Sequence, residues 1–285
     1  MDLRVAGLTI RVSSADRDLP LAPTPASSRF LVAPAAECDA DIDVEAGECR
    51  DEGAGPCLFD SGGPWRLYGH DGGYRFVFVS PRSSAPYKVA VFNADFSIGR
   101  VTLDAGFFAG APAIDPLEYP LDELLVISLL GRGRGVELHC CGVADGEDGY
   151  LFVGQSGAGK TTTARLWLDA GAATVLSDDR VIVREDAVGL WMYGTPWHGD
   201  EPLASPGRAQ LKQIFLLRQH DHHALRTVAR GDAVARLFAA CFPPFHDRAA
   251  LDFTLGFLDR IASRVQVREL GFAPTRSLID FVRSA

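Results

Sequence analysis

Residues 149–183 read GYLFVGQSGAGKTTTARLWLDAGAATVLSDDRVIV, and this stretch decides the fold. Within it, residues 154–161 satisfy the pattern G-x-x-x-x-G-K-[ST]. A predicted strand over residues 150–153 precedes this glycine-rich loop, and a predicted helix over residues 161–170 follows it. Because strand, loop, lysine, threonine and helix occur in this order, the stretch predicts an α/β fold with a site for nucleotide phosphates.

Each part of the loop has a chemical reason to be there. Its glycines let backbone N–H groups approach phosphate oxygens, and the helix N-terminus adds a partial positive charge. The ammonium group of Lys160 reaches the terminal phosphates, and the hydroxyl of Thr161 is placed to bind Mg²⁺. The expected cofactors are therefore ATP and Mg²⁺. The residues expected to contact the nucleotide are Gly154, Gln155, Ser156, Gly157, Ala158, Gly159, Lys160, Thr161 and Thr162.

Two adjacent carboxylates, Asp178 and Asp179, follow the next predicted strand at residues 174–176. The order strand, loop, helix, strand brings the end of this second strand beside the phosphates. One carboxylate can then organise Mg²⁺ while the other accepts a proton from a hydroxyl nucleophile. Their mutual repulsion raises the pKa of one of them, which suits a base. The pair therefore predicts phosphoryl transfer to a hydroxyl group.

Two other nucleotide-binding classes fit the sequence poorly. A switch GTPase needs the guanine-reading motif N/T-K-x-D, and no lysine in this chain is followed two places later by Asp. An ABC-type ATPase shows the motif LSGGQ, which is absent from the sequence.

The segment 149–183 resembles the core of the HPr kinase/phosphorylase family, which is related to phosphoenolpyruvate carboxykinase. The resemblance is strongest to the shorter HPr-kinase-related proteins found beside peptide-modification and lasso-peptide gene clusters. It covers roughly residues 116–285, including the tail RVQVRELGFAPTRSLIDFVR. It implies a P-loop kinase core of the HPr kinase/phosphoenolpyruvate carboxykinase type and a serine kinase-like, ATP-dependent phosphotransferase.

The resemblance also implies roles for single residues. His139 stands where the family has a His on the strand before the loop, so it is expected near the acidic pair, where it assists proton transfer or orients a carboxylate. The family's base maps to Asp179, and Asp178 is a rival because the preceding loop is about one residue longer here. The family's Arg-Gly motif with a Mg²⁺-binding Glu is absent from YGTPWHGDEPLASPGRAQLKQ, where Glu201 or Asp200 is the candidate metal ligand. This departure leaves open whether the reaction is reversed.

The sequence divides into a β-rich N-terminal domain (1–115) and a kinase domain (116–285), with a proline-rich boundary near residues 110–120. In the first domain we expect one strand over residues 5–12, a hairpin turning at Asp71-Gly72, and a long loop between Pro20 and Pro64 with one short strand at 42–44. Further strands are expected at 88–92, 98–103, 136–143, 181–183, 190–193, 213–217 and 264–270, and helices at 121–130, 232–241, 248–262 and 275–282.

The composition limits the class of protein. The net charge is −9, from 28 Lys and Arg against 37 Asp and Glu, which excludes a broad nucleic-acid-binding surface. Only Lys88, Lys160 and Lys212 are lysines. The N-terminus lacks the pattern of a signal peptide, and no apolar run is long enough to span a bilayer. We therefore expect a cytoplasmic protein with no membrane partner. Its six cysteines have no metal-binding spacing and are expected to be reduced.

The sequence thus predicts an ATP- and Mg²⁺-dependent kinase that phosphorylates Ser or Thr of a peptide or protein, such as a precursor peptide. The N-terminal domain is assigned to acceptor recognition by elimination, since it carries no chemical motif. Two alternatives stay open: a small-molecule kinase or carboxykinase-like enzyme, and a non-catalytic ATP-binding partner protein of a biosynthetic cluster. The sequence does not fix the acceptor or the oligomeric state, and a homo-oligomer is one of the states left open.

Overall fold

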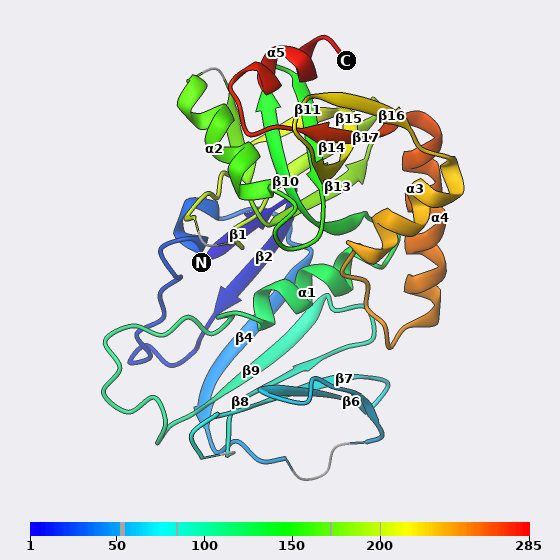
Figure 1. Cartoon of the computed structure of the whole chain (residues 1–285). Coiled ribbons are helices and arrows are strands. Elements are labelled where there is room, and N and C mark those ends of the chain that lie inside the picture. Colours follow the sequence, from blue (N-terminus) through cyan, green and yellow to red (C-terminus); the bar gives the residue numbers. More distant parts are fainter. Residues whose placement is uncertain (52–54, 84, 172, 200) are drawn as a thin grey trace. The chain divides into compact units, whose positions relative to one another are not determined.

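The computed structural model describes residues 1–51, 55–83, 85–171, 173–199 and 201–285 (Figure 1). The chain divides into two compact units, Met1–Leu129 and Leu130–Ala285. Large sheets and five α-helices make the described part of the chain a mixed α/β protein. The division falls at the end of helix α1 (Leu121–Leu130), whereas the sequence analysis placed it before that helix. None of the described helices is long and apolar enough to cross a membrane.

The first unit is built on a nine-stranded sheet, counted over the described residues, in the order β3-β1-β2-β4-β9-β8-β7-β6-β5. Its elements are β1 (Asp2–Val5), β2 (Leu8–Ser13), the 3-10 helix η1 (Ser27–Phe30), β3 (Leu31–Val32), β4 (Ala40–Gly47), β5 (Cys57–Asp60), β6 (Trp65–His70), β7 (Gly73–Val79), β8 (Pro86–Phe92) and β9 (Ile98–Asp104). The expected hairpin is present: β6 pairs with β7, and both Asp71 and Gly72 have positive φ.

Several parts of this sheet differ from the sequence prediction. The stretch between Pro20 and Pro64, expected to be loop apart from one short strand, also contains η1, β3 and β5. The single strand expected over residues 5–12 is a hairpin, because Ala6 and Gly7 have φ values of 51° and 76° and pair Val5 with Leu8. The strand expected at 42–44 is the eight-residue β4, which lies within the sheet and runs parallel to β2 and β9. Acidic residues alternate with its buried apolar side chains and gave the segment the composition of a loop.

The second unit is built on an eight-stranded sheet, again over the described residues. Its strand order is β11-β10-β13-β14-β15-β17-β16, with β12 beside β10 and a further pairing of β11 with β15. The sequence predicted every element except β16, with ends shifted by a few residues. The elements are β10 (Val136–Asp145), β11 (Asp148–Val153), α2 (Lys160–Ala170), β12 (Thr174–Ser177), β13 (Arg180–Glu185), β14 (Leu190–Gly194), β15 (Arg208–Gln219), β16 (Ala224–Thr227), α3 (Arg230–Ala239), α4 (Arg248–Arg264), β17 (Gln266–Phe272) and α5 (Ser277–Arg283).

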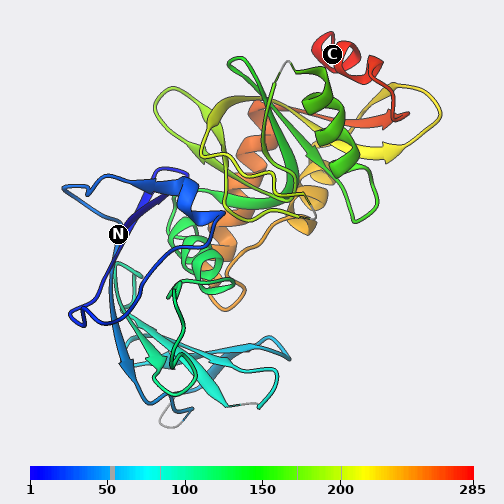
Figure 2. The same ribbon diagram turned by 90° about the vertical axis from the view of Figure 1, so that its left-hand side faces the viewer.

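Helices cover both faces of this second sheet (Figure 2). On one face α3 and α4 contribute Leu237, Leu258 and Ile261 to the core. On the other face α2 and α5 contribute Trp167 and Leu278 to a second core. Because these side chains are buried on both faces, the sheet is packed between two layers of helices. The loops that follow its strands are therefore attached to a well-packed core.

The register of β10 brings three segments to one edge of the sheet. Val153, the last residue of β11, pairs with Cys140, and Ser177, the last residue of β12, pairs with Gly142. Both strands run antiparallel to β10, so they end at the same edge. The glycine-rich loop and the acidic pair therefore leave the sheet close together, next to His139 on β10.

Candidate active site

A compact glycine-rich loop, residues 154–159, joins β11 to α2. Gly154 has no room for a side chain, since a Cβ there would lie 2.6 Å from Cβ of Ala158. Gly157 and Gly159 have φ values of 80° and 107°, a region that favours glycine. The amide of Ala158 donates to the carbonyl oxygen of Gln155, which closes the loop on itself. The loop opens directly into the N-terminus of an eleven-residue helix, an arrangement suited to binding anions.

Lys160, the first residue of α2, folds back over this loop. Its Nζ donates hydrogen bonds to the carbonyl oxygens of Gly154 and Gln155, at 2.9 and 3.4 Å. Burial lowers the pKa of Lys160, and the negative charge of Asp179 opposes that effect. The ammonium group thus lies at the loop, where its present partners are neutral carbonyls that an anion can replace.

Gly159 packs against the ring of Phe272, and a Cβ there would lie 2.4 Å from Cζ of that ring. Gly159→Ala is expected to lower the free energy of unfolding by about 2 kcal/mol, because the methyl group clashes and also opposes a φ of 107°. Chemical denaturation measures the loss. Gly157→Ala is the matched control: its φ is also positive, but a Cβ there has no atom within 4 Å, so we expect a cost of about 1 kcal/mol. Equal losses would contradict the packing argument.

The turn after β12 is fixed by Ser177, which is fully buried. Its Oγ accepts hydrogen bonds from the amides of Asp179 and Arg180 and donates one to the carbonyl oxygen of Trp197. The amide of Cys140 on β10 donates to the carbonyl oxygen of Asp179 at 3.0 Å. These bonds fix the backbone of the acidic pair against the neighbouring strand, so its carboxylates are held in place.

Asp178 is almost completely buried, with 2% of its surface exposed. Its Oδ1 accepts a hydrogen bond from the amide of Gly199 at 3.0 Å, while Oδ2 has no hydrogen-bond partner among the described residues. Burial raises the pKa of Asp178, although the bond from Gly199 works in the opposite direction. A buried carboxylate oxygen without a partner is an unfavourable arrangement that a bound cation would relieve.

Asp179 is held in direct contact with His139. Its Oδ1 lies 3.0 Å from Nδ1 of His139, and its Oδ2 accepts a hydrogen bond from Arg180. Burial alone would raise the pKa of Asp179, but the hydrogen bond from His139 and the charges of Arg180 and Lys160 lower it. The two neighbouring carboxyl groups therefore have pKa values shifted in opposite directions, a pattern typical of sites that handle protons.

Arg180 is a site residue that the sequence analysis missed. Its Nη1 lies 3.1 Å from Nδ1 of His139, and its guanidinium group lies 4.2 Å above the ring of Phe242. Its Nε lies 3.6 Å from Oε1 of the buried Glu137. Nδ1 of His139 cannot accept a hydrogen bond from Arg180 and donate one to Asp179 at the same time, so the two partners favour opposite tautomers. The only signal in the sequence was the position of Arg180 directly after the acidic pair.

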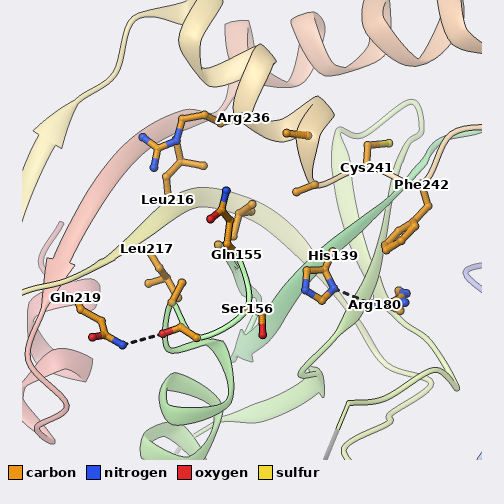
Figure 3. Close-up of a pocket in the computed structure, with 16 residues that line it drawn as sticks. His139, Gln155, Ser156, Arg180, Leu216, Leu217, Gln219, Arg236, Cys241 and Phe242 are labelled. Atoms are coloured by element: carbon orange, nitrogen blue, oxygen red, sulfur yellow. Dashed lines mark hydrogen bonds between the residues drawn. The ribbon is translucent and has the colours of Figure 1, made fainter.

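A cavity of about 790 Å³ opens beside the glycine-rich loop (Figure 3). Residues 154–158 form one wall, His139 and Arg180 lie along it, and Arg236 with residues 239–242 forms the wall at the end of α3. Gln219 at the rim donates a hydrogen bond from Nε2 to the carbonyl oxygen of Gly157 at 2.7 Å. This volume lies within the usual range for small-molecule sites.

The remaining residues expected in the site have different surroundings. Thr161 is half-buried and Thr162 is exposed, both in the first turn of α2. Glu201, an expected metal ligand, forms an ion pair with Arg165 on the exposed side of α2. A metal ion at Glu201 would have to displace that arginine. Asp200, the other carboxylate considered, lies outside the described residues.

Comparison with known proteins gives no assignment. The chain matches no protein-family model, and it has no significant match among curated proteins.

Proposed function

We propose that the protein is an ATP- and Mg²⁺-dependent kinase that transfers a phosphoryl group to a Ser or Thr hydroxyl of a peptide or protein. The observation that supports this most is the meeting of three features at one edge of the second sheet. They are a glycine-rich loop with its lysine, a buried carboxylate with an unpartnered oxygen, and a carboxylate in contact with a histidine. In this proposal the second unit has a P-loop kinase core of the HPr kinase/phosphoenolpyruvate carboxykinase type.

The phosphate groups would lie in the glycine-rich loop. Its backbone N–H groups and Lys160 would stabilise the charge on the phosphoryl group as it is transferred. The residues present fit a magnesium ion, because Oδ2 of Asp178 lacks a partner among the described residues and Thr161 offers a hydroxyl at the start of α2. Asp178 and Thr161 would hold Mg²⁺, which supplies positive charge to neutralise phosphate oxygens.

Proton transfer would fall to Asp179 and His139. The acceptor hydroxyl loses its proton to this pair as its oxygen forms the new bond to phosphorus and the bond to the leaving diphosphate breaks. A carboxylate with a lowered pKa is a weak base alone, but it stabilises a protonated imidazole next to it. For this role the Nδ1–H of His139 must face Asp179, so Arg180 must give up its contact with Nδ1.

The acceptor is the part of the proposal that rests on the resemblance to HPr-kinase-related proteins. Those proteins are found beside peptide-modification gene clusters, and this favours a precursor peptide over a metabolite as the acceptor. Recognition of that peptide by the first unit is assigned by elimination, because the chemistry-bearing residues lie in the second unit. A panel of small hydroxyl compounds beside the peptides separates the two acceptor classes.

Labelled ATP tests the proposal directly. We expect the wild-type protein to transfer label to a Ser- or Thr-containing peptide encoded near its own gene, and Lys160→Ala to lower that rate about 100-fold. Lys212→Ala is the matched control, since Lys212 is an exposed lysine paired with Asp148 and should leave the rate unchanged. Equal transfer by the wild type and Lys160→Ala would overturn the kinase assignment. Tight, Mg²⁺-dependent ATP binding without turnover would favour a non-catalytic partner protein.

A further inference from the structure

The turn between β15 and β16 carries a second cluster of metal-ligating side chains, His220, Asp221 and His222. Nδ1 of each histidine lies 2.6 Å from Oδ1 of Asp221, and the three ligating atoms lie within 4.8 Å of one another. The side chains of Asp221 and His222 are 87% and 66% exposed, so an ion in solvent can reach them. None of the three belongs to the site described above.

Two groups compete for Nδ1 of His220. The backbone amide of His222 lies 3.3 Å from this nitrogen and needs a lone pair on it, whereas Oδ1 of Asp221, at 2.6 Å, needs a proton on it. The nitrogen can serve only one of the two at a time. A metal ion on Nδ1 would take the lone pair in place of the amide of His222, which lies in an exposed turn and can bond to water instead. The same ion would bind the carboxylate of Asp221 as a second ligand.

We propose that His220, Asp221 and His222 bind a divalent transition-metal ion of the kind that imidazole prefers, such as Zn²⁺. Two imidazole nitrogens and one carboxylate oxygen are the usual protein ligands of an open tetrahedral zinc site, with water in the fourth position. The ligand atoms would have to separate to roughly 3.3 Å, which a surface turn permits. Mg²⁺ would bind poorly because it prefers oxygen ligands.

The surrounding structure limits the ligands to these three. The amide of His220 donates to the carbonyl oxygen of Phe272 at 3.0 Å, and His220 packs on Gly271, where a Cβ would lie 3.2 Å from Cβ of the histidine. The next residue, His223, points elsewhere: its Nε2 lies 3.0 Å from Oγ of Ser277. His220 is thus a fixed ligand, and the exposed Asp221 and His222 can adjust to the ion.

The same turn is connected to the glycine-rich loop from both sides. Gln219, next to His220 in the chain, donates to the carbonyl oxygen of Gly157. Phe272, which accepts the amide of His220, packs its ring against Gly159. A metal ion on the turn would hold both contacts in place and so stabilise the loop. We therefore expect the metal to tighten nucleotide binding about fivefold, and this second step rests on the proposed function.

Calorimetric titration of the whole protein with Zn²⁺ tests the metal site without any nucleotide. The wild type should bind one equivalent, and His222→Ala and Asp221→Asn should each weaken binding at least about tenfold. His70→Ala is the matched control, because His70 also lies beside an aspartate, Asp71 at 3.7 Å, but has no second histidine in the cluster. Mg²⁺ in place of Zn²⁺ should give no comparable heat. Equal Zn²⁺ binding by the wild type and His222→Ala, or equal loss in His70→Ala, would overturn the site.

Nucleotide titrations at fixed, buffered free Zn²⁺ with excess Mg²⁺ test the connection to the loop. The nucleotide dissociation constant should fall about fivefold with Zn²⁺ in the wild type and should not change in His222→Ala. An unchanged constant in a wild type that binds both ligands would overturn the connection and leave the metal site. A wild type that binds Zn²⁺ but no nucleotide would refute the proposed function instead. Thermal unfolding without metal checks that His222→Ala and Asp221→Asn are folded.

Discussion

Asp179→Asn is expected to lower the rate of phosphoryl transfer about 10³-fold while nucleotide affinity stays within about twofold of the wild type. The amide keeps the size of the side chain but loses the negative charge that favours a protonated His139. Among the described residues, the carboxylate of Asp179 is held by His139 and Arg180, so the phosphate-binding residues should stay in place when it is changed. Steady-state transfer rates together with calorimetric nucleotide binding measure the two quantities separately.

His139, which contacts Asp179, gives the control. His139→Gln should cause a loss of similar size, and the double variant should be little worse than either single variant, because residues that act as a unit are not additive. Losses that multiply would mean that Asp179 and His139 act independently. A fall in nucleotide affinity as large as the fall in rate would instead assign Asp179 to metal binding or to structure.

Local signals in the sequence were enough for the glycine-rich loop and most of the second sheet. The loop is a contiguous motif whose glycines, lysine and helix start are each required by its own backbone, so no distant residue has to be known. The turn at Asp71 and Gly72 was predictable for the same reason. The turn at Ala6 and Gly7 was not, because alanine rarely adopts a positive φ and gave no sign of a break.

The network around the acidic pair was beyond the sequence. Arg180 reaches His139 and Glu137 only because the register pairs β10 with β13 side by side, and no motif states that register. Glu201 was a candidate metal ligand because it lies in the region that corresponds to the Mg²⁺-binding motif of the family the sequence resembles, yet its partner is Arg165 of α2. Side-chain partners across strands depend on tertiary packing, which a local pattern does not encode.

Asp178→Asn is expected to stabilise the free protein by about 1 kcal/mol and, in the same variant, to lower phosphoryl transfer about 10³-fold. The carboxyl group of Asp178 is buried and one of its oxygens lacks a partner among the described residues, so its charge at neutral pH costs stability. Asparagine removes the charge and keeps an oxygen for the amide of Gly199. Thermal unfolding of the second unit within the whole protein should show a rise of about 2–4 °C.

The pKa shifts explain why Asp178→Asn should stabilise the protein and why Asp179→Asn should destabilise it. The raised pKa of Asp178 means that its penalty is absent below its unfolded pKa and appears as the pH rises through the folded pKa. The advantage of Asp178→Asn should therefore fade as the pH is lowered toward that range. Asp179 has a lowered pKa, so its ionised form stabilises the fold at neutral pH, and Asp179→Asn should lower the melting temperature.

Magnesium and nucleotide should remove or reverse the stability advantage of Asp178→Asn over the wild type. A cation bound at Oδ2 of Asp178 turns the buried charge into a favourable contact, so Mg²⁺ with ATP should stabilise the wild type more than Asp178→Asn. The melting temperatures of the two proteins should then converge or exchange rank when both ligands are added. If the wild type gains no more from Mg²⁺ and ATP than Asp178→Asn does, Asp178 is not a metal ligand. Its unpartnered oxygen would then be only a cost to the fold.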